Sequence, residues 1–184
     1  MHAAEGHVWC QKCGTQPNGF KIAIEMGHVE HIHIAPAEGA PVQSVSEIQA
    51  VAGVGLIGDR YATSEHDDDY DGGQDLTLVE AEALERLAAE EGIQLEPGAT
   101  RRNVTTRGIS LNDLVGKTFS VGGVMARGIE LCEPCNHLQS MVGRPILRPL
   151  AHRAGLRAQL LSSGTIRVGD SVAPAPEQAE VEAR

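Results

Sequence analysis

Residues 117–131 of the chain read KTFSVGGVMARGIEL and contain two runs, 117–121 and 124–131, in which apolar residues alternate with polar or small ones. An alternation with a period of two is typical of strands that bury one face. Gly122 and Gly123, between the runs, accept the positive φ angles of a tight turn. The stretch therefore predicts a β-hairpin.

Similar patterns lie on both sides of this hairpin. Residues 22–24 and 29–34 alternate in the same way and are interrupted near Gly27, which predicts two half-buried strands. Residues 156–174 predict a final hairpin that bends at Ser162-Ser163-Gly164. The chain thus contains several short strands separated by glycine turns.

Helical signals are fewer. Thr77 and Glu80 form a capping box, which predicts a helix from residue 78 to residue 91 that stops at Gly92. Only single helical turns are expected at 110–113 and 138–142. Many short strands with few short helices favour a mainly β barrel over a parallel α/β sheet.

Bulk properties limit the function. The 184 residues suffice for one domain that needs no disulfide to fold, so the four cysteines are free for chemistry. The formal charge of -10 and the five aromatic residues disfavour a nucleic-acid surface. No segment has the length of a membrane span or the pattern of a signal peptide. We expect a cytoplasmic protein with reduced thiols that binds neither nucleic acid nor membrane.

The second cysteine pair, Cys132 and Cys135, follows the 117–131 hairpin in the sequence ELCEPCNHLQ. Three chemistries could use it: a disulfide exchanger, a metal site with two thiolates, or a cofactor site in which one sulfur acts as ligand or carrier. Cys10 and Cys13 form another CxxC pair near the start. Together the two pairs could bind zinc in a non-enzymatic module, which is the competing hypothesis.

Two further stretches offer polar groups. Arg101, Arg102 and Asn103 could face Asp59 and Arg60, which follow a glycine-rich loop, and the arginine forks would then bind an anion. Two other patterns are weaker metal candidates, because His31 and His33 are only two ligands and the acidic loop lacks the closing glutamate of a calcium site. That loop contains Asp67, Asp69 and Asp71.

Four motifs occur in register: GLIGDRYA, DLTLVEAEALERL, RRNV with GISLNDLVGKTFSVGGV, and ELCEPCNHL. In order and spacing they resemble the MOSC domain, the module named for the C-terminal part of molybdenum cofactor sulfurases. The resemblance covers residues 19–172, with an N-terminal extension at 1–18 and an acidic, disordered tail at 173–184. It implies a twisted β barrel like that of pyruvate kinase, with a few short helices.

The resemblance also implies a site. Cys135 corresponds to the family's cysteine that ligates molybdenum or carries sulfur, with Cys132 beside it, and is the expected catalytic residue. Arg101 and Asn103 correspond to an Arg-x-Asn that meets the cofactor's phosphate, and we expect Asp59 and Arg60 at the rim. Related enzymes reduce N-hydroxylated molecules with electrons from a partner protein, whereas other members accept sulfur from a donor.

The chain departs from those reductases in two respects. Pro134 stands where they carry an arginine before the ligand cysteine, and the region before Gly19 is much shorter than theirs. The family is also associated with pyridoxal phosphate, but none of the three lysines lies in a Schiff-base context, so we do not expect that cofactor here.

Overall fold

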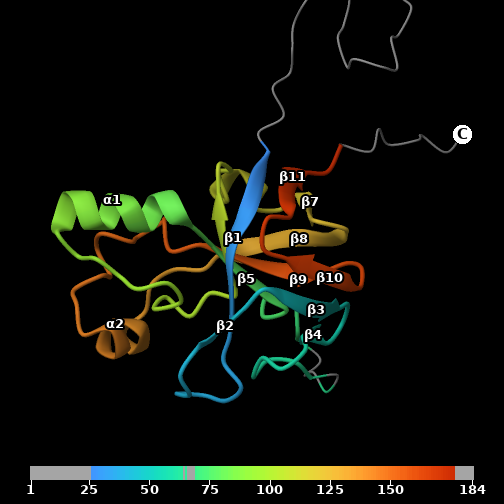
Figure 1. The fold of residues 1–184 in the computed structure, drawn as a ribbon, viewed down its shortest axis with the longest axis horizontal. Helices are drawn as coiled ribbons and strands as arrows, with labels where there is room; N and C mark the ends of the chain where they lie inside the picture. The colour runs from blue at the N-terminus through green and yellow to red at the C-terminus, as the bar shows by residue number, and fades with distance from the viewer. Residues whose placement is uncertain (1–25, 64, 66–68, 177–184) are drawn as a thin grey trace, which may run out of the picture.

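A computed structural model describes residues 26–63, 65 and 69–176, which form a mainly β domain around a closed barrel (Figure 1). Within this part of the chain, seven strands close the barrel by pairing in a ring. In order around the wall they are β1 Gly27–Ile34, β11 Ser171–Pro174, β7 Thr118–Val121, β8 Val124–Leu131, β9 Leu156–Leu160, β5 Leu76–Glu80 and β6 Val104–Arg107, which pairs with β1 again. The sequence-based expectation of a β barrel is confirmed.

The hairpin that the sequence predicts at 117–131 is confirmed as β7 and β8. Val121 pairs with Val124 across the turn, and Gly122 has a φ of 58°. A Cβ on Gly122 would lie 2.3 Å from Oδ2 of Asp170, so a larger residue would collide there. Phe119, like the two valines, is completely buried, which explains why one face of this hairpin forms the barrel interior.

One predicted boundary is wrong. Residues 76–80 form the strand β5, and the helix α1 begins later, as Ala81–Glu91. Leu76 and Leu78 are completely buried, because β5 pairs with β6 on one side and β9 on the other. Tertiary pairing therefore overrides the local capping signal of Thr77. The end of the helix at Gly92, with a φ of 66°, agrees with the prediction.

The predicted final hairpin is also wrong. β9 pairs with β8 and β5 inside the barrel, whereas β10 Gly164–Arg167 pairs with β3 Glu47–Val51. Together with β4 Gly55–Leu56, these two strands make a separate three-stranded sheet. The short strand β2 Gln43–Val45 extends the barrel wall beside β1. Of the two strands expected at the start, the second is β1, and residues 22–24 lie outside the described part.

Both helices of the described part lie on the side of the barrel opposite β3, β4 and β10 (Figure 1). The second helix is α2 Asn136–Val142, and a 3₁₀ turn, η1, spans Asn112–Leu114. A small apolar cluster separate from the barrel core holds this region together. It consists of Leu87, Ile93, Leu138, Ile146, Leu150 and Ala154. Neither described helix has the length and apolar character to cross a membrane.

Candidate functional site

A cavity of about 540 Å³ lies at the end of the barrel where β1 and β8 finish and where β6 and β9 begin. Among its described lining residues, Glu38 is the only carboxylate. The chain carries a formal charge of -10, so this cavity reverses the sign of the protein locally and favours an anion. The lining guanidinium groups belong to Arg60, Arg101, Arg102 and Arg157.

The two cysteines after β8 have different surroundings. Cys132 is only 2% exposed, and its backbone N–H donates to the carbonyl of Gly155 at 2.8 Å. Cys135 is exposed and lines the cavity. It also caps α2, where its Sγ accepts a hydrogen bond from the backbone N–H of Leu138 at 3.4 Å. Cys135 therefore faces the cavity, whereas Cys132 is buried in the protein and does not line it.

Arg102 fixes the loop that carries these cysteines. Its guanidinium donates to four backbone carbonyls, at 3.3 Å to Thr100, 3.1 Å to Ala154, 2.8 Å to Cys132 and 3.4 Å to Glu133. Burial lowers the pKa of Arg102, but a guanidinium remains charged at any working pH. Arg102 therefore joins three segments of the chain around the cavity.

Glu133 anchors the same loop on its other side. Its Oε2 accepts a hydrogen bond from the backbone N–H of His152 at 2.8 Å, and its Oε1 lies 2.8 Å from Nδ1 of the same residue. His152 has a φ of 60°, which is uncommon for a residue with a side chain. The cysteine loop is thus held by Arg102 and by the segment before β9.

Arg101 has a different set of contacts. Its Nη1 donates to the carbonyl of Ala40 at 2.7 Å, whereas its Nη2 is buried and has no hydrogen-bond partner among the described residues. The backbone φ of Arg101 is 57°, an arrangement that is costly for a side-chain-bearing residue and that concentrates at functional sites. Burial, followed by the charge of Arg60, lowers the pKa of Arg101. A bound anion would supply the missing acceptor.

Asn103 and Asp59 form a buried bracket behind the cavity. The Oδ1 of Asn103 accepts from the backbone N–H of Thr77 at 3.1 Å and from its hydroxyl at 2.7 Å. The Nδ2 of Asn103 donates to the carbonyl of His33 at 3.3 Å and to Oδ2 of Asp59 at 3.2 Å. That carboxylate oxygen also accepts from the N–H of Ala35 at 2.9 Å. Neither Asn103 nor Asp59 lines the cavity in this arrangement.

Arg60, predicted together with Asp59, does line the cavity, and its guanidinium carbon lies 4.3 Å from the centre of the Tyr61 ring. Sequence reasoning missed Arg157 and His137, which line the same cavity. The sequence contained a signal for Arg157, because this arginine stands between two apolar residues, Leu156 and Ala158, in the alternating run that forms β9. Both of these neighbours are fully buried. For His137 the only signal was its place two residues after Cys135.

His31 and His33, another metal candidate, lie within the described part of the chain and do not line this cavity. The rings of His31 and His33 are 6.0 Å apart, and His33 is buried beneath the segment that contains Gly98. No group of three or more potential metal ligands occurs among the described residues. Cys10, Cys13 and Asp67 lie outside that part of the chain, so the zinc hypothesis and the acidic loop stay predictions.

Comparisons with known proteins identify the family and the fold separately. A family model described as MOSC domain matches residues 58–173. The fold is similar to the YuaD protein from Bacillus subtilis, with a TM-score of 0.70 and 16% sequence identity over 82% of this chain and 97% of that one. It is also similar to YiiM from Geobacillus stearothermophilus, with a TM-score of 0.63 and 14% identity over 84% and 77% of the two chains.

YiiM from Escherichia coli is a further structural relative, with a TM-score of 0.59 and 15% identity over 80% of this chain and 69% of that one. At such low identities these likenesses establish the fold alone. A search of the curated proteins gave no match.

Proposed function

Because the chain belongs to the MOSC domain family, we propose that its cavity binds the molybdenum cofactor, with the Cys135 thiolate as metal ligand and Arg101 at the phosphate. The family is associated with this cofactor. A thiolate is a soft, strongly donating ligand that suits a high-valent, sulfur-ligated metal. A guanidinium matches the charge and the paired oxygens of a phosphate.

One observation carries the proposal. The Nη2 of Arg101 is a buried donor without a partner among the described residues, and it belongs to a side chain that lines the same cavity as the exposed Cys135. A buried donor without an acceptor lowers the free energy of unfolding by about 1–3 kcal/mol, and by more if it is charged. Such a donor therefore calls for an explanation, and a ligand that supplies the acceptor is one. Nη2 is covered in this conformation, so the proposal requires the guanidinium to turn toward the cavity when the anion binds.

The remaining predicted residues have supporting roles in this proposal. Arg60 adds positive charge to the cavity wall, while Asn103 and Asp59 hold the segment behind Arg101 in place. Cys132 is buried and keeps the cysteine loop attached to Gly155 through its backbone. One thiol, rather than two, is thus available at the cavity.

When bound, the cofactor would supply two-electron redox chemistry. We propose an N-hydroxylated small molecule as the substrate and a partner protein in the cytoplasm as the source of electrons. The second use of the same site is transfer of sulfur, in which Cys135 would carry a sulfur atom from a donor protein. Both uses depend on the Cys135 thiolate, so one pair of variants tests them together.

The test adds isolated molybdenum cofactor to apoprotein and measures the molybdenum retained per chain after gel filtration. Cys135→Ser should lose nearly all of the retained metal, because the oxygen of serine is a harder and weaker donor. Cys132→Ser is the matched control and should retain most of it. Incubation of the same variants with a persulfide donor, followed by mass spectrometry, measures the sulfur-carrier alternative.

Two results would contradict the proposal. Equal loss of molybdenum in both cysteine variants would indicate a paired-thiolate site. One zinc per chain and no retained molybdenum would instead favour the zinc module that uses Cys10 and Cys13 as well.

A further inference from the structure

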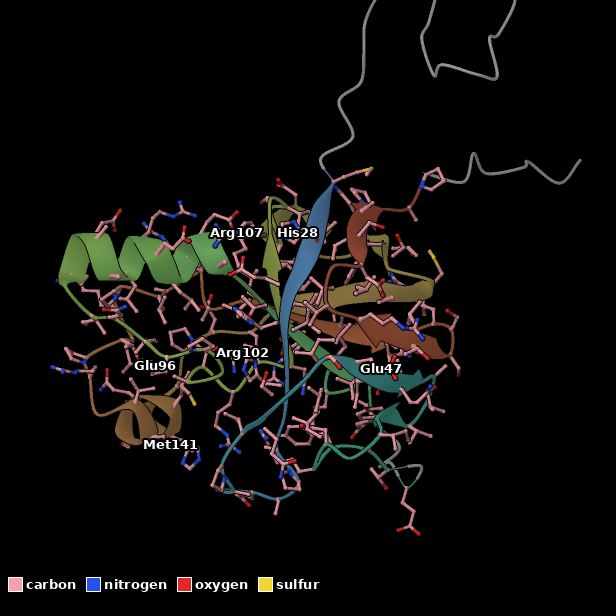
Figure 2. All side chains as sticks on the ribbon, viewed as in Figure 1. His28, Glu47, Glu96, Arg102, Arg107 and Met141 are labelled. Atoms are coloured by element: carbon pink, nitrogen blue, oxygen red, sulfur yellow. The ribbon has the colours of Figure 1, made fainter. Side chains whose placement is uncertain are left out.

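A second hollow, of about 360 Å³, adjoins the cavity. Arg101 and Met141 line both, so these two side chains form the boundary between them. Figure 2 shows Met141 and Glu96 on the same side of the molecule as Arg102, near α2 and away from Arg107 and His28. Arg101, which we propose binds the phosphate, therefore has the cavity on one side and the second hollow on the other.

The second hollow offers both charged and apolar groups. Glu96 and Arg144 are exposed and form no ion pair or side-chain hydrogen bond with the described residues, and Gln94 is also without a side-chain partner there. Leu95 and Val142 contribute apolar surface. A guanidinium, a carboxylate and an amide around an apolar floor could bind a phosphate and a flat, amino-bearing ring together.

The position of Arg144 is defined by the end of α2. Gly143 ends the helix with a φ of 66°, and its N–H donates to the carbonyl of Gln139. The side chain of Gln139 then accepts a hydrogen bond from the N–H of Leu147 at 3.3 Å. These contacts hold the segment after the helix next to the hollow, so Arg144 is presented by an anchored turn.

From this arrangement we infer that the second hollow is a nucleotide subsite. Its ligand is a nucleoside esterified to the phosphate that Arg101 binds, with Arg144 at the phosphate and Glu96 at an amino or imino edge of the base. A carboxylate accepts hydrogen bonds from such an edge. The inference rests on the proposed function for the phosphate end and extends it to a nucleotide-bearing form of the ligand.

Calorimetric titration of the full chain with inorganic phosphate, ribose 5-phosphate and guanosine monophosphate tests this inference. Guanosine monophosphate should bind about tenfold more tightly than ribose 5-phosphate, the effect of one or two additional hydrogen bonds to a charged group. Glu96→Gln should remove most of that difference. Arg144→Gln and Arg101→Gln should each weaken the binding of all three probes, because both guanidinium groups bind the phosphate.

Arg148→Gln is the matched control, because Arg148 is exposed four residues further along and lines neither hollow. It should bind like the unaltered protein. Equal affinity for ribose 5-phosphate and guanosine monophosphate, or a base preference that survives Glu96→Gln, would overturn the subsite while leaving the phosphate site intact. Failure of all three probes to bind would overturn both the subsite and the proposed role of Arg101.

Discussion

Two walls of the cavity each contain a pair of like residues with unlike surroundings. On one wall, Arg102 donates to four backbone carbonyls, whereas Arg101 donates to one and keeps a nitrogen without a described partner. On the other wall, Cys132 is buried and Cys135 is exposed to the cavity. In each pair, one residue builds the wall and the other is available to a ligand. The number of hydrogen-bond partners inside the protein separates the roles of the two arginines, and burial separates those of the two cysteines.

The largest effect is expected from Arg102→Met. This change leaves four carbonyls without their shared donor, and hydrogen bonds to a charged group contribute about 1.5–3 kcal/mol each when considered singly. We expect the free energy of unfolding in urea to fall by about 2–4 kcal/mol, because the released carbonyls can partly find water. Cys132 should also become accessible to iodoacetamide in the native protein, as measured by mass spectrometry.

Arg102→Lys shows whether charge or geometry is responsible. A lysine keeps the positive charge but cannot reach several carbonyls with one rigid fork. Alkylation of Cys132 should therefore increase in this variant as well. Protection of Cys132 in both variants would mean that Arg102 does not hold the loop, and the contrast with Arg101 would fail.

An intermediate effect is expected from Arg101→Met, and on binding instead of stability. Inorganic phosphate should bind more weakly by about 1.5–3 kcal/mol in calorimetry, because the free guanidinium donor is lost. The free energy of unfolding should change by less than about 1 kcal/mol, since only the hydrogen bond to Ala40 disappears. A drop in stability as large as that of Arg102→Met would show that the two arginines do not differ in role.

The smallest effect concerns His33, which lies beneath the Arg101 segment. Burial, followed by the neighbouring His31, lowers the pKa of His33 below its ordinary value of 6.5. Neutral His33 thus contributes stability above that value, which is lost as the pH falls toward the folded pKa. Urea unfolding between pH 7.5 and 5.5 should therefore show a shallower decline in His33→Gln than in the unaltered protein. The exposed His28→Gln is the control, and an equally shallow decline there would contradict the assignment.

Local patterns predicted the parts of the fold whose neighbours are close in sequence. The hairpin of β7 and β8 depends on its own alternation and on Gly122, and both are visible in the sequence. The two wrong predictions depend on distant partners. Thr77 resembles a helix cap, but its side chain bonds to Asn103, and β10 pairs with a strand more than a hundred residues earlier. No local signal contains those pairings.

The candidate site was likewise predictable only where local sequence carries the information. The resemblance to the MOSC domain pointed to Cys135, and the structure has this residue at the cavity. Asn103 has the residue type of a ligand donor, yet its polar atoms are satisfied inside the protein. Only the folded chain reveals which donors already have partners inside the protein. The sequence could therefore name the candidate residues, but it could not separate those that bind a ligand from those that hold the structure.

The closure of the barrel determines when this protein can become native during its synthesis. β1 pairs with β11, which joins Gly27 to Val172. The ring therefore stays open until almost all of the described chain has left the ribosome. Until then, the part of β1 at Gly27 and His28 has one edge uncovered, whereas β2 pairs with the rest of that edge. Barrels dominated by such distant pairings fold slowly compared with helical domains. We expect nascent chains that end before residue 171 to expose the apolar interior, which makes them clients for chaperones.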